Sequence, residues 1–86
     1  MSYYYRDVNG KRHALNPYTN IDGLIIKGQK FHYGQHIAPA DFICGWTSKT
    51  IKKGKPLFCS TAITFDDRVY SSLSALKQAI IAKKGL

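Results

Sequence analysis

The hydrophobic pattern of the chain changes its period once, close to residue 71. Before this point, apolar and polar residues alternate in short segments, which is typical of half-buried β-strands. After it, Leu73, Leu76 and Ile80 recur at the spacing of one face of an α-helix. We therefore predict an α+β fold, a small twisted antiparallel β-sheet built from hairpins with one C-terminal amphipathic helix packed on it.

The clearest local signal is Asn9-Gly10, which separates the strand-like segments 3–8 and 11–15. Both residues adopt positive φ at little cost, so the dipeptide predicts a hairpin with a two-residue turn. Asp66-Asp67 is expected to close a second hairpin. The further predicted strands are 23–27, 30–33, 42–47, 57–65, which is the longest, and 68–70.

Two more predictions concern the middle and the end of the chain. Pro39 suits the first helical position and favours a single helical turn over 38–42, and Trp46 is expected in the core because its neighbours are apolar. The C-terminal helix is expected to begin after Ser71 or Ser72 as N-cap and to stop at Gly85.

The length of 86 residues predicts one small domain, 1–86. Apolar residues make up 44% of the chain, so intrinsic disorder is not expected. The sequence contains no apolar run of the ~18 residues that a membrane span needs, and residues 1–7 lack the apolar stretch of a signal peptide. We therefore expect a cytoplasmic location and no membrane partner.

Positive charge is concentrated in the second half of the chain. The net charge is +8, of which residues 1–48 carry +2 and residues 49–86 carry +6. This asymmetry indicates a polyanionic partner, which is a nucleic acid, a phosphorylated small molecule or an acidic protein surface. The alternative is that the lysines only keep a small domain in solution.

A lysine-rich turn carries much of this charge. Lys49, Lys52, Lys53 and Lys55 lie within seven residues around Gly54, so a hairpin there presents several ammonium groups at once. Phosphates attract such a turn without sequence preference. The alternative is a solvated turn that protects a strand edge from aggregation.

Tyrosines complete the predicted interface. Tyr3 and Tyr5 share one face of the first strand, where they could stack on unpaired bases or anchor a protein partner. The predicted nucleic-acid-binding residues are Lys49, Lys52, Lys53, Lys55, Arg68, Lys77, Lys83, Lys84, Arg6, Lys11, Arg12, Tyr3 and Tyr5.

Two segments resemble parts of known modules. Residues 45–57, with Trp46 before a basic segment, Gly54 and Leu57, are similar to the core of SAND DNA-binding domains. Residues 68–76 look like the strand-into-helix step of small modules attached to phage and restriction nucleases. Each resemblance covers less than a third of the chain and assigns no family, but both imply contact with nucleic acid.

The sequence offers little for catalysis or metal binding. It contains no glutamate and its five aspartates lie mostly at turns, so we expect no enzymatic activity. His32 and His36 are spaced like a zinc-binding pair that Cys44 and Cys59 would complete. Because fourteen residues separate the two cysteines, we interpret them as small core residues and expect no cofactor.

These observations favour a non-enzymatic nucleic-acid-binding protein that contacts DNA or RNA phosphates through the lysine-rich hairpin and the C-terminal helix. The alternative is a small accessory protein of a phage or mobile element that inhibits a host protein by binding an acidic surface.

Overall fold

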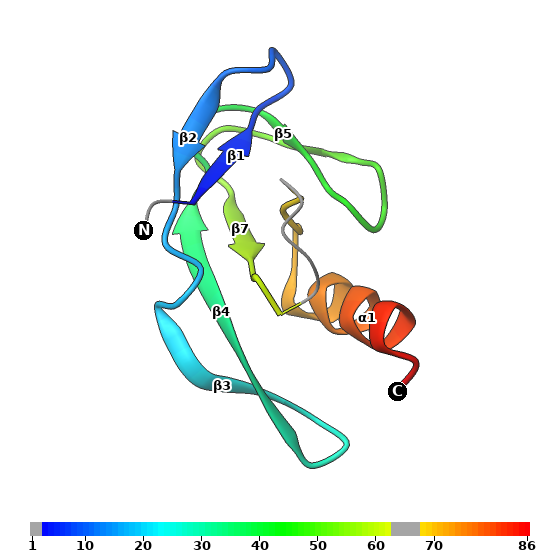
Figure 1. Cartoon of the computed structure of the whole chain (residues 1–86). Coiled ribbons are helices and arrows are strands. Elements are labelled where there is room, and N and C mark those ends of the chain that lie inside the picture. The colour runs from blue at the N-terminus through cyan, green and yellow to red at the C-terminus, as the bar shows by residue number, and fades with distance from the viewer. Residues whose placement is uncertain (1–2, 63–67) are drawn as a thin grey trace.

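The computed structural model describes residues 3–62 and 68–86. Within them, antiparallel strands and one C-terminal helix form the α+β fold that the sequence predicts (Figure 1). The strands lie in three small sheets, β1-β2, β3-β4-β7 and β5-β6. The elements are β1 (Tyr4–Arg6), β2 (Arg12–Ala14), β3 (Asn20–Ile26), β4 (Gln29–Ile37), β5 (Phe42–Ile43), β6 (Thr50–Ile51), β7 (Pro56–Cys59) and α1 (Leu73–Lys84).

The first hairpin forms as predicted, but its turn is longer than two residues. Tyr5 pairs with His13 and Arg6 with Arg12, after which the amide of Asp7 donates to the Lys11 carbonyl at 2.9 Å. Gly10 has a φ of 81°, whereas Asn9 does not take positive φ. The Asp7 carboxylate explains this geometry, because it accepts hydrogen bonds from the amides of Asn9 and Lys11.

A two-residue turn occurs instead between β3 and β4. Lys27 and Gly28 have φ values of 49° and 81°, and Ile26 pairs with Gln29. Positive φ at both central residues suits the twist of the flanking strands. The predicted strand 30–33 is too short, because β4 continues through Gly34 to Ile37 and pairs there with Pro56 of β7.

Three sequence predictions are wrong or only partly correct between residues 38 and 65. No helical turn forms over 38–42. The predicted strand 42–47 stops early, because the Ser48 amide bonds to the Cys44 carbonyl and turns the chain. The predicted strand 57–65 also stops early, at Cys59. The chain turns after it, and the Ser60 hydroxyl accepts a hydrogen bond from the Ala62 amide in this turn. Residues 63–65 and the predicted turn at Asp66-Asp67 lie outside the described residues.

Residues 69–70 join two of the sheets. The Val69 carbonyl accepts a hydrogen bond of 2.8 Å from the Gly45 amide, next to the β5-β6 sheet. Tyr70 exchanges two backbone hydrogen bonds with Phe58 of β7, both at 2.8 Å. The predicted strand 68–70 therefore forms only as two bridges that hold the sheets together.

Helix α1 begins and ends where the sequence predicts. The Ser72 hydroxyl accepts the Ala75 amide at 3.1 Å, and Gly85 ends the helix in the left-handed conformation with a φ of 69°. Ala75, Leu76, Ala79 and Ile80 form its buried face, which packs near β3 and β7. Among the described residues, no helix is both long and apolar enough to cross a membrane.

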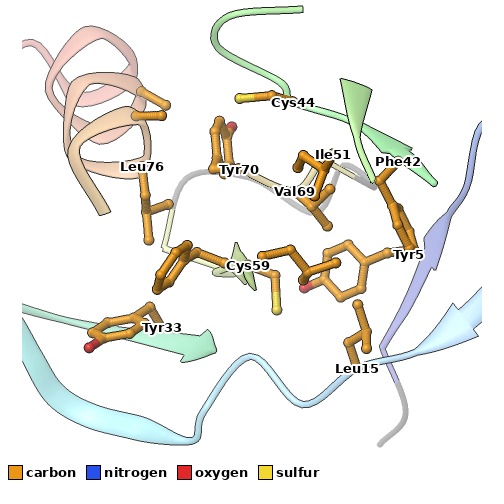
Figure 2. Close-up of a cluster of buried hydrophobic side chains, with 14 of the residues drawn as sticks. Tyr5, Leu15, Tyr33, Phe42, Cys44, Ile51, Cys59, Val69, Tyr70 and Leu76 are labelled. Atoms are coloured by element: carbon orange, nitrogen blue, oxygen red, sulfur yellow. The ribbon is translucent and has the colours of Figure 1, made fainter. Parts of the chain in front are cut away.

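The core brings together side chains from the hairpin, the central strands and the helix (Figure 2). Phe42, Leu57, Leu76 and Ile80 are completely buried. Cys44 and Cys59 are buried free thiols, in agreement with their prediction as core residues. Trp46 is not part of this core, because 47% of its surface is exposed.

Candidate nucleic-acid interface

Asp41 connects two basic turns that are distant in the sequence. Its carbonyl accepts the amide of Val8 at 2.9 Å, in the turn of the first hairpin. Its carboxylate accepts the amide of Lys53 at 2.8 Å and lies 3.9 Å from the Lys52 ammonium group. The turn 7–11 and the turn 52–55 therefore lie side by side.

The lysine-rich turn has an ordered backbone. The Lys55 amide donates to Lys52, and Gly54 takes a φ of 90°. Two further hydrogen bonds, at 2.9 and 2.8 Å, join Gly54 and Lys55 to the backbone of Ala38. The turn is not the tip of a hairpin as predicted, because β6 pairs with β5 while β7 pairs with β4.

Asp7 orders the neighbouring turn. The carboxylate is buried and accepts a hydrogen bond from His13 Nε2 at 2.8 Å. This bond lowers the pKa of Asp7, whereas burial of the carboxyl group raises it. The hydrogen bonds from the amides of Asn9 and Lys11 lower the pKa further, so the net shift is downward. The Asp7 carboxylate therefore interacts with hydrogen-bond donors of its own hairpin.

The first hairpin adds two arginines to the same end of the molecule. Arg6 and Arg12 are paired at the last position before the turn 7–11, and both are exposed. The two turns and this flanking pair of arginines hold six basic residues, which we call the basic end: Arg6, Lys11, Arg12, Lys52, Lys53 and Lys55.

The structure corrects the predicted role of Tyr5. Only 3% of Tyr5 is exposed, because the alternation of β1 directs it into the core, and burial raises its pKa. Tyr5 therefore cannot stack on a base at the surface. Tyr4 is 49% exposed instead, with the Arg12 guanidinium over its ring at 5.4 Å from the centroid.

Tyr3 belongs to a different cluster, at the opposite end of β7 from the lysine-rich turn. Its ring meets that of Tyr18 edge-on, and Tyr18 stacks on His32 with ring centroids 4.4 Å apart. Thr61 Oγ1 is hydrogen-bonded to both Tyr18 and His32, at 2.9 and 2.6 Å. Burial lowers the pKa of His32, so its neutral form is favoured.

The other predicted basic residues are not gathered at the basic end. The Lys84 ammonium lies over the ring of Phe31 in β4, beside the hairpin β3-β4, and Lys77 and Lys83 are exposed on the same helix. Arg68 packs beside Gly45, near the loop that contains Lys49. The predicted interface is thus divided between separate surfaces.

Sequence reasoning missed Trp46 as a surface residue. It lies in the turn 45–47 between β5 and β6, and Ser48, which follows this turn, has a φ of 63°. Gly45 before it and Thr47-Ser48 after it are turn-forming residues, and they were the available signal that the strand ends here.

The histidines and cysteines considered as zinc ligands have other hydrogen-bond partners. Nε2 of His36 donates a hydrogen bond to the Asn16 carbonyl, and the Cys59 thiol donates one to the Gly34 carbonyl. Among the described residues, no three potential metal ligands gather in one place.

Cys44 has a distinctive electrostatic environment. Burial raises its pKa, but hydrogen bonds from Thr47, the Trp46 amide and the Ser71 hydroxyl outweigh this effect and lower the pKa to about 7.

Comparison with known proteins adds no assignment. No protein-family model matches the chain, and no curated protein or solved structure is significantly similar to it.

Proposed function

We propose that this protein binds nucleic acid in the cytoplasm, without catalysing a reaction, through phosphate contacts of its basic end. The observation that carries the proposal is the position of Asp41 between the two basic turns. Through these contacts, two basic segments that are distant in the sequence lie next to each other. A phosphate backbone attracts such a surface, and each contact releases condensed counterions.

The order of the turns supports this proposal. The backbone of residues 52–55 is held by hydrogen bonds to Ala38 and Asp41, and the turn 7–11 is held by Asp7. Binding therefore does not have to order these backbones first, which reduces its entropic cost.

The test is a salt titration with a dye-labelled oligonucleotide, followed by fluorescence anisotropy. Replacing Lys52, Lys53 and Lys55 together with Gln should flatten the plot of log affinity against log salt by about 2–3 units, at ~0.7–0.9 per contact. The matched control replaces Lys77, Lys83 and Lys84 with Gln, which removes the same charge from helix α1. Equal losses in both variants would show that net charge, rather than the basic end, determines binding.

A second candidate function is inhibition of a host protein through an acidic surface, as an accessory protein of a phage or mobile element. The exposure of Trp46 and Ile43 favours it, because aromatic and apolar side chains anchor many protein interfaces. This function predicts negligible nucleic-acid affinity at physiological salt, with the lysines increasing the association rate for the partner. A wild-type protein that binds neither DNA nor RNA at low salt would contradict the first proposal and favour the second.

A further inference from the structure

The β5-β6 sheet has one buried face and one exposed face. Phe42 and Ile51 pair across it and are buried, whereas the next pair, Ile43 and Thr50, is exposed. Since side chains alternate along a strand, Asp41 and Lys52 extend the exposed face toward the basic end. Their side-chain contact at 3.9 Å agrees with this placement.

The loop at the other end of this sheet has an ordered backbone. The Cys44 amide donates to the Lys49 carbonyl at 2.9 Å, and the Ser48 amide donates back to Cys44 at 3.0 Å. The Gly45 amide donates to Val69, which holds the loop against the rest of the molecule. The loop conformation is therefore set by the protein itself before any ligand arrives.

Trp46 is presented by this ordered loop. It is 47% exposed, as is Ile43 on the adjoining strand, and Lys49 is exposed on the same loop. Ser48 takes the left-handed conformation, which is unfavourable for residues other than glycine and which clusters at binding sites. The β5-β6 sheet thus has the basic end at one end and an exposed indole ring in the loop at its other end.

We infer that Trp46 stacks on a base of a single-stranded nucleic acid whose phosphates contact the basic end. This inference rests on the proposed function and adds the class of nucleic acid. Bases in a duplex are already stacked on each other, whereas an unpaired base offers its face to an aromatic ring. The exposed Lys49 on the same loop, together with the lysines of the turn 52–55 at the other end of the β5-β6 sheet, favours an anionic strand over an apolar protein segment.

The stack should be tolerant of sequence. Every base has a π-face, so a single tryptophan selects unpaired bases without reading their edges. The protein is therefore expected to prefer single strands over duplexes of the same sequence, with little preference among homopolymers that lack secondary structure.

Trp46 is the single tryptophan of the chain, so its fluorescence reports on this residue alone. The test titrates the protein with an oligo-dT strand and with an abasic strand of equal length. Anisotropy of a dye on each strand measures binding independently of the tryptophan. We expect both strands to bind, but only oligo-dT to quench Trp46.

Variants make the test quantitative. Trp46→Ala should weaken oligo-dT binding by roughly 5- to 150-fold, the range for loss of one base–aromatic stack, and leave abasic binding within about twofold. Trp46→Phe should retain part of the difference in affinity between oligo-dT and the abasic strand, because phenylalanine keeps an aromatic ring. The matched control is Ile21→Ala, which shortens another exposed apolar side chain on β3 and should leave both affinities unchanged. Thermal unfolding followed by circular dichroism checks that each variant folds.

The outcomes separate the two proposals. Binding of both strands with unchanged Trp46 fluorescence, and an unaltered oligo-dT affinity in Trp46→Ala, would overturn this inference and leave the proposed function intact. Absence of binding to either strand at low salt would overturn the proposed function, and this inference with it.

Discussion

The backbone carbonyl of Asn16 occupies the space that a β-carbon on Gly34 would need, so the two backbones are in direct contact. Segment 16–18 crosses β4 at this point, with a histidine on either side. His36 donates a hydrogen bond to Asn16 at 2.8 Å, and His32 stacks on Tyr18. The crossing attaches the N-terminal hairpin to the three-stranded sheet.

Gly34→Ala should therefore be strongly destabilising. The new methyl group would meet the Asn16 carbonyl and, at 2.9 Å, the Cα of Pro17, and neither backbone atom can rotate away. We expect a loss of about 3 kcal/mol or more in the free energy of unfolding, measured with urea. The control is Gly54→Ala, where no atom beyond the two neighbouring residues lies within 4 Å of the added carbon and only the positive φ is unfavourable, at roughly 1–2 kcal/mol. A smaller loss at Gly34 than at Gly54 would contradict the observed crossing.

Stability should depend on acid pH through Asp7. The hydrogen bond from His13 keeps the pKa of Asp7 below its ordinary value of 3.8 in the folded protein. The carboxylate therefore stabilises the fold above that value, and its contribution is lost as the pH falls through the lower, folded pKa. Asp7→Asn should be less stable at neutral pH and should lose less stability than the wild type on further acidification.

The measurement for Asp7 is urea unfolding at a series of pH values from about 5 to 2. The control is Asp22→Asn, which changes an exposed aspartate on β3. Identical pH profiles for Asp7→Asn and the wild type would mean that the Asp7–His13 pair does not stabilise the fold.

Substitutions on the two faces of helix α1 should differ sharply in their effect on the free energy of unfolding. Leu76 is completely buried, so Leu76→Ala should cost roughly 2–5 kcal/mol. Lys77 is exposed, and Lys77→Ala should change the free energy of unfolding by less than about 0.5 kcal/mol. Chemical denaturation of both variants checks the assignment, and similar losses would contradict it.

The negative charge of Asp41 should weaken nucleic-acid binding, even though the hydrogen bonds of Asp41 hold the two basic turns next to each other. Asp41→Asn keeps an acceptor for the Lys53 amide but removes the negative charge beside Lys52. We expect tighter oligonucleotide binding at low salt, by a few-fold, with a difference that shrinks as salt screens the charges. Anisotropy titrations at two salt concentrations measure this, and weaker binding in a folded Asp41→Asn variant would refute it.

Local signals in the sequence predicted those elements whose stability is local. The Ser72 cap, the apolar stripe through Leu76 and the stop at Gly85 all act within one or two helical turns. The first hairpin was also predictable from Asn9-Gly10, although Asp7 changed its turn through bonds to amides two and four residues away.

Strand ends were less predictable, because tertiary partners decide them. β4 continues through Gly34 because β7 pairs along it, and glycine is needed there for the crossing of segment 16–18. Apolar alternation continues past Cys59 and Ile43, but turns formed by Ser60 and by Ser48 end both strands.

The sequence by itself determined the α+β class, the helix with its caps and the excess of positive charge, because composition and short-range periodicity carry that information. Only the tertiary structure decided which basic segments lie next to each other. Asp41 joins Val8 to Lys53 across more than forty residues of sequence, which no local pattern encodes. The same long-range packing buried Tyr5 and left Trp46 at the surface, because a core is filled by the side chains that its strands direct inward.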